Sequence, residues 1–572
     1  MKFLAKKIYI ILFLLLTLLF ESDAFAKENQ TVYTDKNISN YFLGIISSNQ
    51  NHNNKSYEYL KKVQLLKERH SNFNIEFIRT LVLLEKFDQA FAFSKSIWDK
   101  DELFFEADLL LGIDSLIKKD YTNADKYFER LNTISRYNLF FQDFIGNVLI
   151  AWSKAAQENK NESFKFLEKV PDPYRHLVKT QNSLLMCYFK DSKTEKFYEE
   201  LINDEDYNFS RYSFFLANHL LFKNKNIEAK KLISKSRKKN NSNILIKQAE
   251  NFLENNKSKK IKNFFNCENS LDSIAEFFYI LANFYASEQE YQMSNFYLKI
   301  SLFLNDKFTS NKALLAENLF YQGQRKLSEK AYDSLKPIGP VYSWFAARSI
   351  ASILLKEKGK IYSIKMLENE FNLISNPNFE DHYELANFYK DNEYYNESIT
   401  HYSLALEKIK KNHHLVPKIL DRRGTSFERL GDWEKAEKDL LESLKIIPDQ
   451  AHVLNYLAYS WVDKGINLDK GLEMLKKASE LRKDDGYIID SLGWAYYAKQ
   501  DYVKAEKYLQ RAVELMPSDP IVNDHYADAL WMLKKDIQAR YFWKYVLKLN
   551  DIEQELKEVV KRKLIFGITK KL

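Results

Sequence analysis

The sequence predicts an all-α protein, built as a right-handed α-solenoid of helix–turn–helix hairpins. With 13 and 9 residues among 572, glycine and proline are too scarce for a fold rich in β-hairpins or in nucleotide-binding loops. Apolar residues recur with helical spacing along the whole chain. Small residues recur every 34 or 35 positions, in one series at Gly424, Ala458, Gly493 and Ala527 and in another at Ala436, Gly471, Ala505 and Ala539. A fixed period of this length is typical of stacked helical hairpins.

The two series of small residues indicate how the helices of one hairpin pack. They are offset by 12 or 13 positions, which places one small residue on each helix where the two helices cross. A large side chain at this crossing would force the helices apart. Pro448 and Pro517 follow the second helix of their hairpins and stop it. One hairpin cannot bury its apolar face alone, so neighbouring hairpins must stack.

Residues 1–26 are expected to be a cleaved secretory signal peptide. Lys2, Lys6 and Lys7 precede the apolar run 8–20, and Ala24-Phe25-Ala26 fits a small-residue cleavage site. The apolar run is shorter than the roughly 20 residues that span a bilayer. No cysteine precedes Cys187, which argues against a lipoprotein. We therefore expect a periplasmic mature chain without a transmembrane span.

The remaining chain divides by how well it keeps the repeat. Residues 27–245 predict a divergent N-terminal array of hairpins, with traces of the pattern at Gly112, Ala124 and Ala217. Residues 246–270 break the frame and predict an irregular join. Degenerate repeats follow over 271–378, and five regular repeats over 379–553. Residues 554–572 are charged and predict a capping helix with a tail, because a terminal repeat needs a polar outer face.

The regular part resembles a known family. Its runs are LNYLAYSWVDKGINLDKGLEML from Leu454, DDGYIIDSLGWAYY from Asp484 and PSDPIVNDHYADALWMLKKDIQARYFW from Pro517. They resemble the exported tetratricopeptide (TPR) repeat proteins common in α-proteobacteria, over residues 422–543 closely and elsewhere only in repeat layout. Ala458 and Ala527 stand where that family more often has glycine. The resemblance implies a location in the Gram-negative envelope and a role as an adaptor or scaffold.

Charge and cysteine content narrow the function further. The net charge of +8 is mild for this length, and the basic clusters 237–239 and 257–260 contain no aromatic residues. We interpret these clusters as solvated loops and expect no nucleic-acid partner. Cys187 and Cys267 are the only cysteines, and their distance along a solenoid favours two buried free thiols over a disulfide.

No catalytic, metal or cofactor motif is present. The chain lacks the His-Glu-x-x-His zinc motif, and His413-His414 and His382-Tyr-Glu384 do not have its spacing. It also lacks a Gly-x-Ser-x-Gly elbow and a phosphate-binding glycine loop. We therefore expect a protein that is not an enzyme and that binds no cofactor.

The first helix of each regular hairpin is expected to line a groove for protein or peptide partners. Aromatic and acidic residues alternate there, which suits a cationic or amide-rich chain. The candidate residues are Tyr456, Tyr459, Asp463, Tyr487, Asp490, Trp494, Tyr497, Asp524, His525 and Trp531. His452, Asn455, Ser491 and Asp528 are expected on the same groove. The alternative for Trp494 and Trp531 is packing between repeats.

The favoured function is a non-catalytic scaffold or adaptor of the bacterial envelope, with peripheral envelope association compatible with this role. One alternative is a structural subunit of an envelope assembly, secretion or polysaccharide-export machine. Another is an enzyme with an unrecognised site in residues 138–270. That alternative requires a compact non-repeat fold with clustered acids or histidines in this segment.

Overall fold

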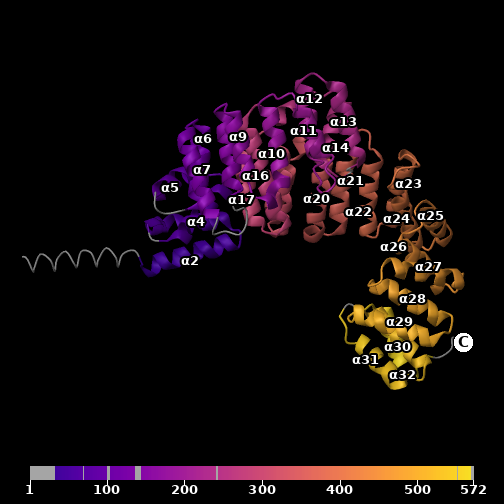
Figure 1. The fold of residues 1–572 in the computed structure, drawn as a ribbon. Helices are drawn as coiled ribbons and strands as arrows, with labels where there is room; N and C mark the ends of the chain where they lie inside the picture. Colours follow the sequence, from indigo (N-terminus) through magenta and orange to yellow (C-terminus); the bar gives the residue numbers. More distant parts are fainter. Residues whose placement is uncertain are drawn as a thin grey trace, which may run out of the picture. The chain divides into compact units, whose positions relative to one another are not determined.

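The computed structural model describes residues 33–68, 70–99, 104–135, 143–239, 242–550 and 552–568. Over these ranges the chain forms α-helices joined by short loops, with no strand (Figure 1). The predicted all-α solenoid of helical hairpins is therefore confirmed. The expected signal peptide, 1–26, lies outside the described residues. Among the described helices, none combines the length and apolar character needed to cross a membrane.

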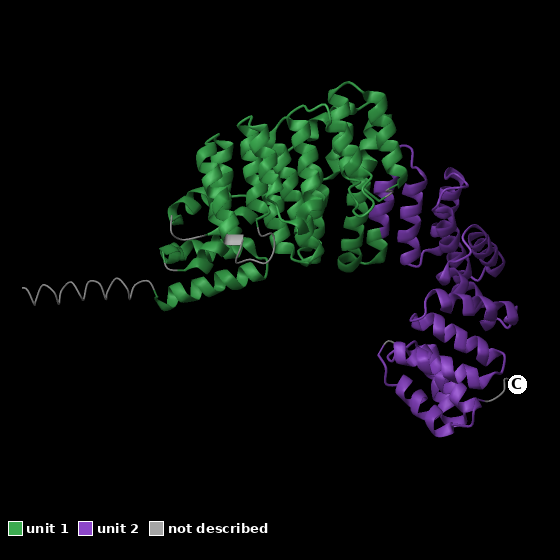
Figure 2. Ribbon diagram, viewed as in Figure 1, with its two compact units in different colours: residues 1–363 green, residues 364–572 purple. Residues whose placement is uncertain are grey.

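The chain divides into two compact units, residues 1–363 and 364–572 (Figure 2). The described helices of the first unit are α2 (Asp35–Asn49), α3 (Asn53–Leu60), α4 (Ser71–Leu83), α5 (Phe87–Ile97), α6 (Phe105–Ile117), α7 (Tyr121–Ser135), α8 (Ile145–Ala156), α9 (Lys160–Glu168), α10 (Arg175–Tyr188), α11 (Thr194–Ile202), α12 (Tyr212–Phe222), α13 (Asn226–Lys239), α14 (Ile244–Glu254), α15 (Ser258–Phe264), α16 (Ser270–Ser287), α17 (Tyr291–Leu304), α18 (Lys312–Tyr321), α19 (Arg325–Asp333) and α20 (Pro340–Lys358). Short 3-10 segments lie at η1 (Lys61–Glu68), η2 (Asp172–Tyr174), η3 (Thr309–Asn311) and η4 (Lys336–Ile338).

Helix α21 (Lys360–Asn372) contains the division between the units. The second unit continues with α22 (Phe379–Asp391), α23 (Tyr395–Lys408), α24 (Val416–Arg429), α25 (Trp433–Ile446), α26 (Ala451–Asp463), α27 (Leu468–Leu481), α28 (Gly486–Ala498), α29 (Tyr502–Leu515), α30 (Pro520–Met532), α31 (Asp536–Val546) and α32 (Gln554–Phe566). Helices pack in consecutive pairs, such as α26 with α27 and α28 with α29. The first helices of the last three pairs begin at Ala451, Gly486 and Pro520, in keeping with the sequence period.

The turns inside the pairs show why few glycines suffice. Each turn needs one residue with a left-handed backbone, and Gln500 supplies it between α28 and α29 with φ +63°. The amide of Gln500 donates to the carbonyl of Tyr497, and the amide of Asp501 donates to that of Tyr496. These bonds satisfy carbonyls at the end of α28. A non-glycine residue is tolerated here because the local hydrogen bonds offset its strain.

The small residues lie where the helices of a pair approach most closely. Gly493 of α28 is buried, and a Cβ atom added to it would lie 2.6 Å from Cγ of Leu509 in α29. Ala505 of α29 is fully buried in the same core. The close crossing inferred from the sequence period is therefore present in this pair.

In the first unit, later helices of the chain pack on the layer that the first helices of the hairpins form. We call this layer the inner layer. The first helices of successive pairs contact one another, α2 with α4, α4 with α6 and α12 with α14, and so form one layer. Helix α16 packs on this layer at α8 and α10, and α17 packs on it at α4. Phe144 at the start of α8 contacts Phe277 of α16 with ring centroids 5.5 Å apart. The side that would form a binding groove is thus occupied over these helices.

A buried ion pair fixes α16 to this layer. Arg211, which precedes α12, donates from Nε to Oε1 of Glu276 at 2.7 Å and from Nη2 to Oε2 at 2.9 Å. Glu276 belongs to α16 and its side chain has no exposed surface. Arg211 also donates to Oδ1 of Asn311 at 2.8 Å and lies over the ring of Tyr279. Burial raises the pKa of Glu276 despite the opposing charge of Arg211, so the pair depends on this geometry.

Residues 246–270, where the sequence predicts an irregular join, contain most of α14 and all of α15. Helix α14 packs on α13 and also on α20, while α15 packs on α12. The segment therefore lies inside the first unit, and the division between units falls near residue 363. The repeat boundaries drawn from the sequence remain predictions.

The prediction of two free thiols is wrong. Cys187, at the end of α10, forms a disulfide with Cys267 in the loop before α16, with Cα atoms 5.8 Å apart. The solenoid argument failed because α16 returns along the inner layer and brings this loop beside α10. The bond closes a segment of 80 residues, and such a link typically contributes about 2 to 4 kcal/mol to stability.

Candidate functional site

The second unit has an open cavity on its inner layer of first helices. Contacts of α26 with α28 and of α28 with α30 make this layer continuous. The cavity has a volume of about 360 Å³ and lies across these three helices. Its lining residues are His452, Asn455, Tyr456, Tyr459, Arg482, Asp485, Tyr487, Ile488, Asp490, Ser491, Asp519, Ile521 and Val522. Four of the ten candidate residues, Tyr456, Tyr459, Tyr487 and Asp490, are therefore brought together.

Three tyrosines supply the aromatic surface of the cavity. The Tyr456 hydroxyl donates to Oε2 of Glu428 at 2.7 Å, which fixes its ring. Tyr459 is half-buried, and burial together with Asp463 raises the pKa of its hydroxyl to about 12. Tyr487 is 60% exposed and lies at the rim. All three hydroxyls therefore stay protonated near neutral pH, and that of Tyr456 already donates its proton to Glu428.

The charged residues of the cavity are mainly acidic. Asp490 is buried and lies 3.0 Å from Nδ1 of His525. Asp485 and Asp519 cap the N-termini of α28 and α30, where each accepts backbone N–H bonds. Arg482 is the one lysine or arginine in the lining, and it pairs with Asp485 at 3.5 Å. The excess of carboxylates favours a cationic occupant.

Asn455 gives the cavity an unused hydrogen-bond acceptor. Its Oδ1 atom is buried and finds no donor among the residues that the structure describes. A buried polar atom without a partner costs about 1 to 3 kcal/mol, so a donor supplied by a partner would be favoured here. Asn455 lines the cavity, and a turn of its side chain would present this oxygen to a backbone N–H of an extended segment.

The other candidate residues lie beside the cavity or beyond it. Trp494 stacks between Tyr497 and His525, with ring centroids 4.6 and 4.0 Å away. Burial alone would lower the pKa of His525, but the neighbouring carboxylates, Asp490 first, raise it above its usual value. Asp463 is exposed at the end of α26. Trp494, Tyr497 and His525 pack on one another within the layer, and contact of Trp494 or Tyr497 with a partner remains a prediction.

At the C-terminal end, α32 covers the predicted groove residues of the last pair. Nζ of Lys563 in α32 donates to Asp524 and to Asp528, each at 2.7 Å. Burial and the nearby Asp524 raise the pKa of Asp528 to about 6. Trp531 packs against Trp543, and a Cβ atom on Gly567 would collide with its ring. Asp524 and Trp531 therefore belong to the packing of the terminal helix.

Sequence reasoning missed Arg482, Asp485 and Asp519, which reach the cavity from loops rather than from helix faces. A signal was available for the two aspartates. Each directly precedes a first helix, and aspartate is favoured at that capping position. The side chain of such a cap lies near the helix start, at the end of the cavity.

A histidine pair in this unit predicts a pH-dependent loosening. Nδ1 of His382 in α22 lies 3.0 Å from Nδ1 of His401 in α23. Burial, with the neighbouring His401, lowers the pKa of His382 to about 4. A histidine with a lowered pKa stabilises the fold above its unfolded pKa of about 6.5, and this stability is lost as the pH falls toward the folded pKa. Acidification to about pH 5 should destabilise α22 and α23 by about 2 kcal/mol.

Hydrogen exchange of the full chain, corrected for intrinsic exchange rates, measures this effect. Peptides from α22 and α23 should lose protection at acid pH, and His382→Asn should flatten the dependence. Peptides near His525 serve as an internal control. The raised pKa of His525 makes its contribution to the stability of the fold largest at low pH, so acidification should not weaken their protection. Equal acid sensitivity in wild type and variant would contradict the assignment.

Comparisons with known proteins agree with the repeat architecture. Residues 488–519 match the tetratricopeptide repeat family. The chain is 33% identical over 103 residues to the TPR repeat-containing protein PA4667 of Pseudomonas aeruginosa, which covers 18% of each protein. It is 25% identical over 84 residues to protein bimA of Emericella nidulans, covering 15% of this chain and 10% of that one. The chain thus spans less than a fifth of the length of either relative.

Two solved structures are also similar to part of the chain. A tetratricopeptide repeat protein from Parabacteroides merdae has 18% identity and a TM-score of 0.33, covering 39% of this chain and 85% of that one. Pseudomonas aeruginosa pilF has 15% identity and a TM-score of 0.32, covering 39% of this chain and all of that one. Proteins with tetratricopeptide repeats generally act as non-catalytic scaffolds for other proteins. Residues 488–519 match such a repeat, within a described chain that is an all-α solenoid of helical hairpins.

Proposed function

We propose that this protein is a non-catalytic scaffold of the bacterial cell envelope that holds an extended, cationic segment of a partner protein in the cavity of α26, α28 and α30. The single observation that carries the proposal is the cavity itself. It combines tyrosine surface, an excess of carboxylates and the unpartnered Oδ1 atom of Asn455. Tyrosines provide contact area at low entropic cost, and the acids orient a basic chain.

Helix packing distinguishes α4, α8 and α10 of the first unit from α26, α28 and α30 of the second, although the first unit also has cavities of about 920 and 1080 Å³. Helices α16 and α17 occupy the inner layer of the first unit at α4, α8 and α10. Along α26, α28 and α30 the inner layer has an open cavity. A partner segment would therefore meet accessible first helices at this cavity.

A peptide library displayed on phage and selected on the mature full-length chain tests the proposal. Selected peptides should be rich in lysine and arginine, and their binding should weaken as salt screens the charges. Asn455→Ala should lower affinity about tenfold, equivalent to about 1.4 kcal/mol, because it removes the acceptor. Tyr459→Ala should have an effect of at least this size.

Tyr541→Ala is the matched control, since Tyr541 is 66% exposed and does not line the cavity. Peptides that bind Asn455→Ala and Tyr459→Ala as tightly as wild type would place binding elsewhere. Selection of mainly acidic peptides would contradict the charge argument.

The envelope location is supported by the signal-like pattern of residues 1–26 and by the Cys187–Cys267 disulfide, a bond typical of oxidising compartments. Cell fractionation and N-terminal sequencing test it. The protein should appear in the periplasmic fraction with Lys27 as its first residue. A cytoplasmic chain that retains Met1 would refute this location.

A further inference from the structure

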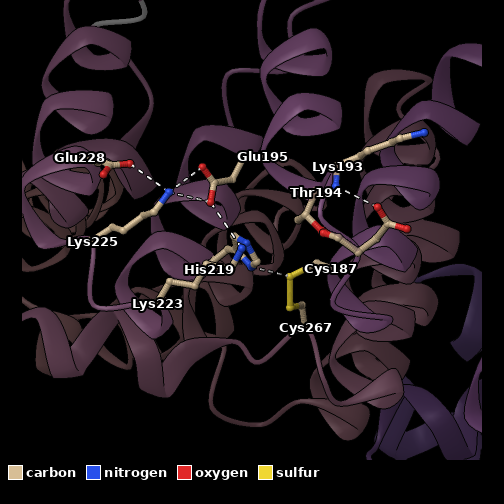
Figure 3. A network of polar contacts seen from close by, with 10 residues as sticks. Cys187, Lys193, Thr194, Glu195, His219, Lys223, Lys225, Glu228 and Cys267 are labelled. Atoms are coloured by element: carbon tan, nitrogen blue, oxygen red, sulfur yellow. Dashed lines mark hydrogen bonds and ion pairs between the residues drawn. A yellow bond between two sulfur atoms is a disulfide. The ribbon is translucent and has the colours of Figure 1, made fainter.

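A cluster of metal-binding side chains lies in the first unit, apart from the cavity described above. Cys187 lies in the last turn of α10, His219 belongs to α12, and Cys267 lies in the loop before α16 (Figure 3). The two sulfurs and a ring nitrogen all lie within 4.8 Å of one another, and all three residues are buried. Nδ1 of His219 is 3.2 Å from Sγ of Cys187.

The three ligand atoms lie close enough to share one metal ion once the bond between the two sulfurs is broken. Zinc binds sulfur at about 2.3 Å and imidazole nitrogen at about 2.0 Å, so ligand atoms on one ion lie at most about 4.6 Å apart. The Cα separation of 5.8 Å between the cysteines suits two sulfurs on one ion as well as a disulfide. Only the S–S bond has to open, and Nδ1 of His219 already faces the sulfurs (Figure 3).

The imidazole of His219 adds a third ligand to the two cysteines. A disulfide with a purely structural role would not need it. Nε2 of His219 is buried and has no hydrogen-bond partner in the described part of the chain, where the contact of Nδ1 with Cys187 is the polar contact of this ring. Glu195, which lies nearby, is bound by Lys223 and Lys225 (Figure 3). That leaves two sulfurs and one nitrogen as the ligand set.

We propose that the reduced form of this cluster binds one thiophilic d10 cation, Cu(I) or Zn(II), through Cys187, Cys267 and His219. A dithiol or phosphine reductant supplies two electrons, and two protons complete the two thiols while the reductant is oxidised. Binding then releases both thiol protons and joins two thiolates and the imidazole to the ion. Soft thiolates select Cu(I) and Zn(II), and a three-ligand set leaves zinc with one open position.

The metal ion would hold the loop before α16 to α10 when the disulfide, which otherwise holds it there, is reduced. Cys267 lies in the loop that leads into α16, and α16 packs on the inner layer at α8 and α10. Either the disulfide or the ion holds this loop to α10. The first unit could then keep its filled inner side under both oxidising and reducing conditions.

The test uses the mature full-length chain, oxidised or reduced with a phosphine that is then removed without air. Each form is incubated with Zn(II) alone or Cu(I) alone and separated from free metal. Metal per chain is measured by mass spectrometry, and thiolate-to-metal charge transfer by near-ultraviolet absorption. The variants are Cys267→Ser, His219→Gln and, as a control, His52→Gln at an exposed histidine.

The site is supported if the reduced wild-type and His52→Gln chains each bind one ion. The oxidised chain and the Cys267→Ser chain should bind none. His219→Gln should bind at least about tenfold more weakly than wild type. The arm that gives one ion per chain by mass spectrometry identifies the ion. Absence of metal from the reduced chain, binding by the oxidised chain, or unchanged affinity of His219→Gln would overturn it. His219→Gln keeps both cysteines, so recovery of its disulfide on reoxidation verifies that its fold is intact.

Discussion

Arg211→Met is expected to destabilise the first unit by about 3 to 5 kcal/mol. The substitution leaves Glu276 buried in α16 without its two hydrogen bonds from the guanidinium. It also removes the cation from the ring of Tyr279 and one bond to Asn311. Hydrogen exchange of the full chain in urea measures the change, and peptides of α12 and α16 should lose protection first.

The double variant Arg211→Met, Glu276→Leu separates the loss of the pair from the loss of packing. Replacing both partners of a buried ion pair by apolar residues is often neutral, so much of the stability should return. The two changes would then be strongly non-additive, because the residues are in contact. A single variant that costs less than about 1 kcal/mol, or a double variant as unstable as the single one, would refute the role of the pair.

Trp543→Ala is expected to cost the second unit about 3 to 5 kcal/mol. Trp543 of α31 is fully buried and packs 5.4 Å from Trp531. Its Nε1 donates to Oδ1 of Asp528 at 3.0 Å, and Asp528 also binds Lys563 of α32. Loss of the ring therefore removes core packing and one of the groups that hold the carboxylate of Asp528.

Trp543→Phe distinguishes these two contributions. It keeps most of the ring and removes the hydrogen bond, so about 1 to 3 kcal/mol should be lost. Urea unfolding followed by exchange of α30, α31 and α32 peptides provides the measurement. Equal effects of the alanine and phenylalanine variants would mean that packing of the indole contributes little, contrary to its burial.

The sequence predicts the regular hairpins well, because their determinants are local and periodic. Small residues such as Gly493 and Ala505 are required where two helices of one pair cross, so the requirement repeats with each pair. The filled inner layer of the first unit was not predictable in this way. It depends on contacts such as Arg211 with Glu276, which are 65 residues apart and follow no period.

The same distinction applies to the sites. Tyr456, Tyr459, Tyr487 and Asp490 could be placed on one face because helical spacing orders them. Trp531 satisfied the same spacing, but the terminal helix region covers it, which the face pattern does not encode. The approach of Cys187, Cys267 and His219 arises from the return of the chain at α16, so sequence distance alone led to the wrong preference for free thiols.

The central claim is that the cavity of α26, α28 and α30 receives a partner segment. Photocrosslinking in living cells tests it most directly, with p-benzoyl-phenylalanine placed at Tyr487 or at Tyr541. Both positions are well exposed, at 60% and 66%, but only Tyr487 lines the cavity. We predict discrete protein adducts at position 487 that become markedly weaker with Asn455→Ala and join through a lysine- or arginine-rich segment. Adducts of unchanged yield with Asn455→Ala, or adducts that form equally at position 541, would contradict the claim.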